Sequence, residues 1–140
     1  MVLKRTLSII KPDAIKAKSH GKILDFLESK GFKVLAQKKL RLSRTQAEEF
    51  YNVHKERPFF NDLVDFMVSG EIVAQVLEAE NAVTYYREVM GDTNPEKAET
   101  GTLRSLYGSD IQCNAVHGSD SDENADKEIS FFFSKLELIT

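Results

Sequence analysis

The stretch Phe32-Lys33-Val34-Leu35-Ala36-Gln37-Lys38-Lys39-Leu40-Arg41-Leu42 alternates apolar and polar side chains over most of its length. Successive side chains of a strand point to opposite faces, so this period of two predicts a β-strand with one buried face, which Lys38 interrupts. Residues 22–30, just before it, carry apolar side chains at helical spacing and end at Gly31, a residue that favours helix ends. A helix followed directly by a strand favours an α/β fold.

The other segments continue this mixture of strands and helices. Residues 6–10 form a β-rich run that Pro12 closes, and residues 72–77 form a nearly continuous apolar strand. Further helices are predicted over residues 43 to about 55, 60–68, 81–90 and 121–133. A last short strand is expected either in the loop before His117 or within residues 134–139. This order suits an α/β sandwich of the ferredoxin-like class, in which helices cover a mostly antiparallel four-stranded sheet.

Length and composition limit the classes of function. The 140 residues contain no internal repeat and no linker, so residues 1–140 are expected to form a single domain. A net charge of −3 argues against a dedicated nucleic-acid binder. Cys113 is the only cysteine, which excludes a disulfide within the chain, and we interpret it as passive. Because no segment resembles a signal peptide or a membrane span, we expect a cytoplasmic protein with no membrane partner.

Residues 91–116 form a long connection with little predicted regular structure. A connection of about 25 residues inside a compact domain is usually functional or disordered. This one contains Thr93-Asn94-Pro95 and Gly101-Thr102-Leu103-Arg104, which are signals for turns and helix caps. We therefore interpret it as an ordered loop that shapes a site.

The segment Val116-His117-Gly118-Ser119-Asp120-Ser121 places a histidine on a glycine-flanked loop just before a predicted helix. The N-terminus of a helix presents unpaired N–H groups and a positive dipole end, so an anion can bind there. A neutral imidazole beside such an anion can act as a nucleophile or as an acid–base group. A turn histidine followed by an ordinary helix cap is the alternative interpretation.

The glycine-rich phosphate loops GxxxxGK[ST] and GxGxxG are absent from the sequence. Phosphate binding would therefore depend on side chains, and Lys11, Arg87 and Arg104 are the candidates. Arginine matches phosphate with a planar fork of donors, whereas lysine acts as a compact point charge. Each of the three, taken alone, is also compatible with a solvated surface cation.

Five motifs occur in order along the chain: Ser8-Ile9-Ile10-Lys11-Pro12-Asp13-Ala14, Arg57-Pro58-Phe59-Phe60, Gly91-Asp92-Thr93-Asn94-Pro95, Gly101-Thr102-Leu103-Arg104 and Asn114-Ala115-Val116-His117-Gly118-Ser119-Asp120-Ser121. Together they closely resemble the nucleoside diphosphate kinase family. The resemblance extends from about Arg5 to Phe133, and the short C-terminal tail is similar to that of bacterial members.

The resemblance implies a phosphotransferase that moves the γ-phosphate of a nucleoside triphosphate, usually ATP, to a nucleoside diphosphate. Such an enzyme maintains the pools of nucleoside and deoxynucleoside triphosphates. The resemblance further implies a ping-pong mechanism and Mg²⁺ as the cofactor, held mainly by the nucleotide phosphates, with no protein ligand assigned. It also implies a homo-oligomer, with a tetramer favoured and a hexamer possible.

Residue by residue, the resemblance makes His117 the nucleophile, attacking through Nδ1, with Glu128 and Ser119 orienting it. Lys11 and Tyr51 would contact the transferring phosphate. The other implied nucleotide contacts are Arg87, Thr93 and Arg104 to phosphates, Asn114 and Lys11 to sugar hydroxyls, Phe59 to the base, and Ile111 opposite it. From the residues alone, Phe59 could equally belong to the core, and Tyr51 could serve packing only.

Three positions depart from the pattern of the family: Glu71, Ala79 and Asp122. We expect Asp122 to point into solvent, because a carboxylate there suits the helix dipole but repels phosphate.

Three other functions remain as alternatives. A non-catalytic nucleotide-binding subunit would be expected to lack the histidine, an RNA-binding module would need further aromatic residues, and a two-component phosphotransfer domain would be all-helical.

Overall fold

A computed structural model describes residues 2–139 and contains one four-stranded sheet, in the order β2-β3-β1-β4. The strands are β1 (Leu3–Ile10), β2 (Lys33–Leu40), β3 (Ile72–Glu80) and β4 (Val116–Gly118). Every neighbouring pair is antiparallel, and β1, one of the two inner strands, pairs with both β3 and β4. The predicted ferredoxin-like α/β sandwich is confirmed.

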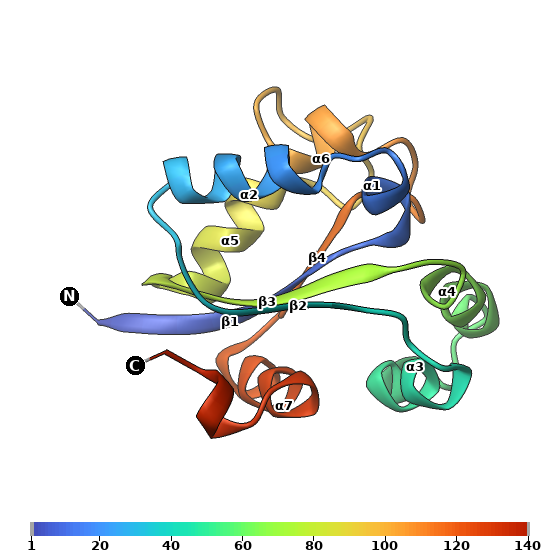
Figure 1. Ribbon diagram of the computed structural model, residues 1–140. Helices are drawn as coiled ribbons and strands as arrows, with labels where there is room; N and C mark the ends of the chain where they lie inside the picture. Colours follow the sequence, from blue (N-terminus) through green and yellow to red (C-terminus); the bar gives the residue numbers. More distant parts are fainter. Residues whose placement is uncertain (1, 140) are drawn as a thin grey trace.

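Helices cover both faces of this sheet (Figure 1). One face carries α1 (Pro12–Lys16), α2 (His20–Ser29), α5 (Ala82–Met90) and α6 (Leu103–Tyr107). The other face carries α3 (Arg44–Phe50), α4 (Phe60–Met67) and α7 (Asp122–Phe132). Two 3₁₀ turns, Asn52–His54 and Lys135–Glu137, follow α3 and α7. No helix within residues 2–139 is long and apolar enough to cross a membrane.

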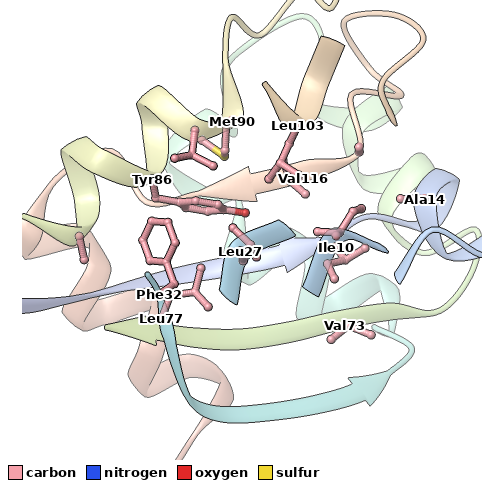
Figure 2. Close-up of a cluster of buried hydrophobic side chains, with 14 of the residues drawn as sticks. Ile10, Ala14, Leu27, Phe32, Val73, Leu77, Tyr86, Met90, Leu103 and Val116 are labelled. Carbon is pink, nitrogen blue, oxygen red and sulfur yellow. The ribbon is translucent and has the colours of Figure 1, made fainter. Parts of the chain in front are cut away.

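The sheet divides the interior into two hydrophobic clusters, because alternate side chains of each strand point to opposite faces. Figure 2 shows the first cluster, in which Tyr86 and Met90 of α5 pack near Val116 of β4. The second cluster lies under α3, α4 and α7 and includes Leu7 and Ile9 of β1. The strand β1, with which β4 pairs, therefore contributes side chains to both clusters.

Local structure differs from the sequence prediction at several points. The helix that begins after Ser43 ends at Phe50 instead of near Lys55, and Ser43 and Gln46 form a capping box at its start. The irregularity in β2 lies between Val34 and Ala36, where Leu35 forms a bulge, and not at Lys38. The Lys38 ammonium donates to the Phe132 carbonyl at 2.7 Å, so the side chain that seemed out of register has a partner on α7.

Two helices were not predicted, and the predicted loop around the histidine is partly a strand. Pro12, expected only to close β1, also begins α1, where a proline without an N–H is well tolerated. The long connection contains α6, which Thr102 caps by accepting from the Ser105 N–H. The last short strand, β4, begins at Val116 just before His117 and includes it, paired with Ile9, whereas residues 134–139 contain a 3₁₀ turn and no strand.

Candidate active site

A cleft of about 990 Å³ opens beside His117 of β4, and residues of α3, α4, α5, α6 and α7 line it together with the segments that connect them. All of the predicted site residues except Ser119 line it. They are Lys11, Tyr51, Phe59, Arg87, Thr93, Arg104, Ile111, Asn114, His117 and Glu128. These residues come from positions far apart in the sequence, so the fold itself brings the predicted set together.

His117 is fixed in orientation by a carboxylate. Its Nε2 lies 2.8 Å from Glu128 Oε1 on α7, and both side chains are about four-fifths buried, with exposed fractions of 19% and 20%. The ring of Phe50 packs edge-on against the imidazole, with the ring centres 5.5 Å apart. Strand pairing holds the backbone of His117, and Glu128 with Phe50 holds its ring.

Ser119 lies behind this pair and does not line the cleft. Its hydroxyl donates to Glu128 Oε1 at 2.9 Å and accepts from the Leu7 N–H at 3.3 Å. The side chain is fully buried. Ser119 therefore contacts the histidine only through Glu128, and links that carboxylate to the central strand.

Lys11 follows the last residue of β1, and its ammonium points at the side chain of Asn114. Lys11 Nζ donates to Asn114 Oδ1 at 2.8 Å, while Asn114 Nδ2 donates to the carbonyls of Thr93 and Ile111 at 3.1 and 2.9 Å. Burial, together with the nearby charge of Arg104, lowers the pKa of Lys11 to about 8. A buried ammonium with one neutral partner is suited to an incoming anion.

Arg104 reaches the same region from α6. Its two terminal nitrogens donate to the carbonyls of Gly91 at 3.1 Å and Val116 at 3.0 Å. Its Nε is buried and has no hydrogen-bond partner among the described residues. Burial lowers the pKa of this guanidinium, which nevertheless stays charged. Arg87, at the last turn of α5, is exposed and supplies a second guanidinium to the cleft.

Tyr51 serves packing and also faces the cleft. The residue is 5% exposed and belongs to the cluster under α3, α4 and α7. Its hydroxyl is buried without a hydrogen-bond partner in residues 2–139, and burial raises the pKa of this phenol well above its usual value. A buried polar group without a partner is costly, so a ligand in the cleft could satisfy it.

The mouth of the cleft carries exposed apolar side chains. Phe59, just before α4, is 48% exposed, and Ile111 is 61% exposed, so neither is a core residue. The ring of His54 lies 5.5 Å from that of Phe59. Neither His54 nor Phe50 carries a signal in the sequence, since both occupy ordinary positions in a helical pattern. Only the fold shows that they belong to the cleft.

The departures from the family pattern lie outside the cleft. Asp122 is exposed, as expected, and pairs with Lys4 at 2.9 Å, while Glu71 faces Lys39 at 3.7 Å on the surface. Ala79 is buried in the first hydrophobic cluster. Burial raises the pKa of the Cys113 thiol, which disfavours the reactive thiolate and supports its interpretation as passive.

Comparison with known proteins gives one consistent result. The family described as nucleoside diphosphate kinase matches residues 4–138. Among curated proteins, the nucleoside diphosphate kinase of Persephonella marina is 56% identical over 139 residues, covering 99% of each chain. That of Wolinella succinogenes is 61% identical over 136 residues, covering 97% of this chain and 99% of its own.

Solved structures agree with the sequence comparison. A crystal structure of the Aquifex aeolicus nucleoside diphosphate kinase superposes with a TM-score of 0.96 at 47% identity, covering 99% of this chain and 100% of that chain. The enzyme of Halobacterium salinarum, solved in complex with CDP, has a TM-score of 0.93 at 37% identity, covering 98% of this chain and 91% of that one.

Proposed function

The chain belongs to the nucleoside diphosphate kinase family, and from this premise we propose that His117 carries the phosphate between its two substrates. The chain is a kinase of nucleotide metabolism, which transfers phosphate from a nucleoside triphosphate to a nucleoside diphosphate. The proposed route is ping-pong, with ATP as the usual donor and a phosphohistidine on His117 as the intermediate.

The hydrogen bond between His117 and Glu128 is the observation that carries this proposal. Glu128 Oε1 lies 2.8 Å from Nε2, and a carboxylate accepts only from a nitrogen that bears a proton. The proton on Nε2 leaves the lone pair of the neutral ring on Nδ1. No described residue forms a hydrogen bond with Nδ1, which is therefore available to a phosphate.

In the first half-reaction, the Nδ1 lone pair forms a bond to the γ-phosphorus. The bond from that phosphorus to the bridging oxygen breaks, and the nucleoside diphosphate leaves with the electron pair. In the second, a β-phosphate oxygen of the acceptor attacks the same phosphorus, and the nitrogen–phosphorus electron pair returns to Nδ1. Glu128 stabilises the positive charge that the ring acquires while the phosphate is attached.

The cations of the cleft would position the phosphates, because phosphoryl transfer depends on placement and charge neutralisation. We assign the transferring phosphate to Lys11 and to the Tyr51 hydroxyl, both of which are buried in the cleft wall. We assign the remaining phosphates to Arg87, Thr93 and Arg104. The unpartnered Tyr51 hydroxyl and Arg104 Nε support these roles, since each lacks the hydrogen bond that a buried polar group requires.

The nucleoside would lie between the phosphate site and the mouth of the cleft. Asn114 and Lys11 would contact the sugar hydroxyls, because their paired side chains line the same cleft as His117. Phe59 would stack on the base, with Ile111 on the opposite side. Their exposure at the mouth supports this role, since an aromatic face left in solvent can stack on any base.

Mg²⁺ is the proposed cofactor, and its fit can be judged from the oxygen donors in the cleft. Residues 2–139 contain no group of three His, Cys, Asp or Glu side chains able to hold a metal. A magnesium ion would therefore be bound mainly by nucleotide phosphates, and the carboxylate of Asp120, which lines the cleft, offers one further oxygen. When bound, the ion would neutralise charge on the phosphates.

The remaining expectations for the chain are part of the same proposal. Residues 1–140 act as a single domain, which is supported by two clusters sharing one sheet. The protein acts in the cytoplasm and assembles as a homo-oligomer, a tetramer in preference to a hexamer, as light scattering would establish. Nucleic acid is not a partner, which is supported by the net charge of −3 and can be tested by gel shift with single-stranded RNA.

Incubation with γ-labelled ATP in the absence of an acceptor tests the mechanism. We expect the protein to become labelled at His117, with an acid-labile bond, and to release ADP. Addition of unlabelled CDP should then move the label into CTP. His117→Ala should abolish label and turnover, whereas His20→Gln, a histidine outside the cleft, should retain both. Label that persists in His117→Ala, or an unlabelled wild type, would refute the proposal.

A further inference from the structure

The residue between Asn114 and Val116 has a strained backbone. Ala115 has a φ of +75°, a region that residues with a Cβ rarely adopt. The Val116 N–H donates to the Asn114 carbonyl at 2.9 Å, which closes a γ-turn around Ala115. Of the three described non-glycine residues with positive φ, Ala115 alone is buried, the others being Lys18 and Asn81.

Two hydrogen bonds from another segment hold this turn. The Ala115 carbonyl accepts from the Lys11 N–H at 2.8 Å, and the Ala115 N–H donates to Asp13 Oδ2 at 3.1 Å. Asp13 lies in the first turn of α1, and its other oxygen, Oδ1, is buried without a partner in residues 2–139. The Asp13 carboxylate is thus the only side chain among the described residues that hydrogen-bonds the peptide N–H of the strained residue.

The turn separates two functional groups. On one side, Asn114 accepts from Lys11 and ties Thr93 and Ile111 to the cleft. On the other side, Val116 begins β4, which carries His117. Strain persists at a functional site only when its surroundings determine the backbone, and a change of φ at Ala115 would move Asn114 relative to His117.

We propose that Asp13 is a positioning residue, which holds the γ-turn at Ala115 and thereby sets the substrate contacts of Asn114 relative to the nucleophile. Asp13 does not line the cleft, and its carboxylate acts through the backbone of Ala115. This inference rests on the proposed role of His117 in phosphate transfer. Asp13 and Ala115 both belong to motifs that resemble those of the family, but the resemblance implies no role for Asp13.

The test measures single-turnover phosphorylation by labelled ATP in a quench-flow instrument, together with the melting temperature of each variant. Asp13→Ala removes the acceptor and is expected to slow phosphorylation by about 10²-fold, the effect of misplacing reacting groups by about 1 Å. Asp13→Asn keeps an oxygen acceptor without the charge and should stay within about threefold of the wild type.

The double variant D13A/A115G distinguishes positioning from other roles of Asp13. Glycine adopts positive φ without strain, so the turn can form without the carboxylate, and the rate should recover by about tenfold or more. D13A/A14G is the matched control, because Ala14 is an equally buried neighbour within the helix α1. It should show no recovery.

Several outcomes would overturn the inference. D13A with a wild-type rate and a lowered melting temperature would make Asp13 merely structural, and equal rates for D13A/A115G and D13A/A14G would remove the turn from the explanation. If D13A does not fold, the inference still requires that D13N and D13A/A115G both fold and that both are phosphorylated at a rate close to that of the wild type. Slow phosphorylation of either variant would overturn the inference. Failure of the proposed function would appear differently, as the absence of phosphohistidine in the wild type.

Discussion

Glu128 Oε1 lies 2.8 Å from His117 Nε2 and also accepts the hydroxyl proton of Ser119 at 2.9 Å, so one carboxylate oxygen links the imidazole of His117 to the buried hydroxyl of Ser119. A hydrogen bond to a charged group contributes more free energy than a hydrogen bond between two neutral groups. The relationship also fixes which ring nitrogen bears the proton. It therefore predicts how the enzyme responds when the charge and the acceptor are removed separately.

Glu128→Gln should slow phosphorylation of His117 by about tenfold, and Glu128→Ala by about 10²-fold, since a hydrogen bond to a charged group contributes about 1.5–3 kcal/mol. Glutamine keeps an acceptor for the Nε2 proton but cannot balance the positive charge of the phosphorylated ring. Rapid-quench labelling with ATP measures both rates. Asp126→Asn, an exposed carboxylate on the same helix, is the control. Equal rates for Gln and Ala would mean that acceptor geometry does not contribute.

Lys11 should make nucleotide binding depend on pH. Its pKa is lowered from 10.5 to about 8 by burial and by Arg104, so the free enzyme loses this charge as the pH rises through about 8. A bound phosphate favours the charged form, so binding near pH 8 should take up protons. Affinity for a nucleoside diphosphate should therefore weaken above about pH 8.

Calorimetry of ADP binding in two buffers that differ in ionisation enthalpy measures this proton uptake. Lys11→Met should bind more weakly and without uptake near pH 8. The arginines of the cleft stay charged in this range and cannot produce the effect. Proton release on binding, or an affinity that does not change between pH 7 and pH 9, would contradict the predicted titration of Lys11.

Removal of the Tyr51 hydroxyl should lower activity without lowering stability. Its hydroxyl is buried without a partner among the described residues, and such a group costs about 1–3 kcal/mol. Tyr51→Phe should therefore leave the free energy of unfolding unchanged or raise it, while phosphorylation of His117 slows. Urea denaturation and rapid-quench labelling of the same preparation measure the two effects. A variant that is less stable but fully active would mean that the hydroxyl serves the fold alone.

Much of this site was predictable because five motifs that resemble those of the family occur in order along the chain. Glu128 and Ser119 were predicted close to His117, and Asn114 close to Lys11, although the last two are 103 residues apart. That prediction came from the family resemblance, since no local pattern encodes such a distance. The roles of Phe50 and His54 could not be predicted, because only the folded chain brings Phe50 against the rings of His117 and Phe131 and places His54 in the lining of the cleft.

Two local features of the structure could not be predicted from the pattern of apolar residues in the sequence. Leu35 stands at a position where strict alternation would put a polar residue, yet it is buried because the bulge turns two successive side chains, Leu35 and Ala36, to one face. The strand containing His117 is three residues long, and it forms because β1 offers a free edge. Pairing partners distant in sequence decide both features, so propensity and periodicity alone could not.

Gly118 should not tolerate a side chain. A Cβ at this position would lie 2.8 Å from the ring of Tyr86, a fully buried residue whose hydroxyl is hydrogen-bonded to Ser8. Gly118→Ala should lower the free energy of unfolding by about 1–3 kcal/mol, as overpacking does, and should slow phosphorylation of the adjacent His117. Gly21→Ala is the matched control, for which the free energy of unfolding should change in the opposite direction.

A Cβ on Gly21 would meet nothing within 4 Å, and its position in α2 favours alanine over glycine. Gly21→Ala should therefore stabilise the protein by about 0.5–1 kcal/mol and leave the rate unchanged. Urea unfolding of the two variants provides the comparison. If both alanines prove neutral, the contact between Gly118 and Tyr86 does not constrain β4.

Substrate choice should depend on the sugar more than on the base. Phe59 and Ile111 offer apolar contact at an exposed mouth, and stacking on an aromatic ring accepts every base. Phe59→Ala should weaken binding of the four nucleoside diphosphates by similar factors, about 5–150-fold for a loss of 1–3 kcal/mol. Leu106→Ala, which removes an exposed side chain of α6 outside the cleft, is the control.

The sugar, in contrast, would meet the buried pair Lys11 and Asn114, which lines the same cleft as His117. Stacking accepts all four bases alike, whereas a 3′-deoxy diphosphate leaves buried polar groups without a partner, so this analogue should react more slowly than all four ordinary diphosphates. The loss should be found mainly in the rate of transfer from phosphorylated enzyme, because the sugar also sets the phosphate chain relative to His117. Rapid-quench transfer to the four diphosphates and to a 3′-deoxy analogue compares these rates directly. A strong preference for one base, together with indifference to the 3′-hydroxyl, would contradict the assigned positions of Phe59 and Asn114.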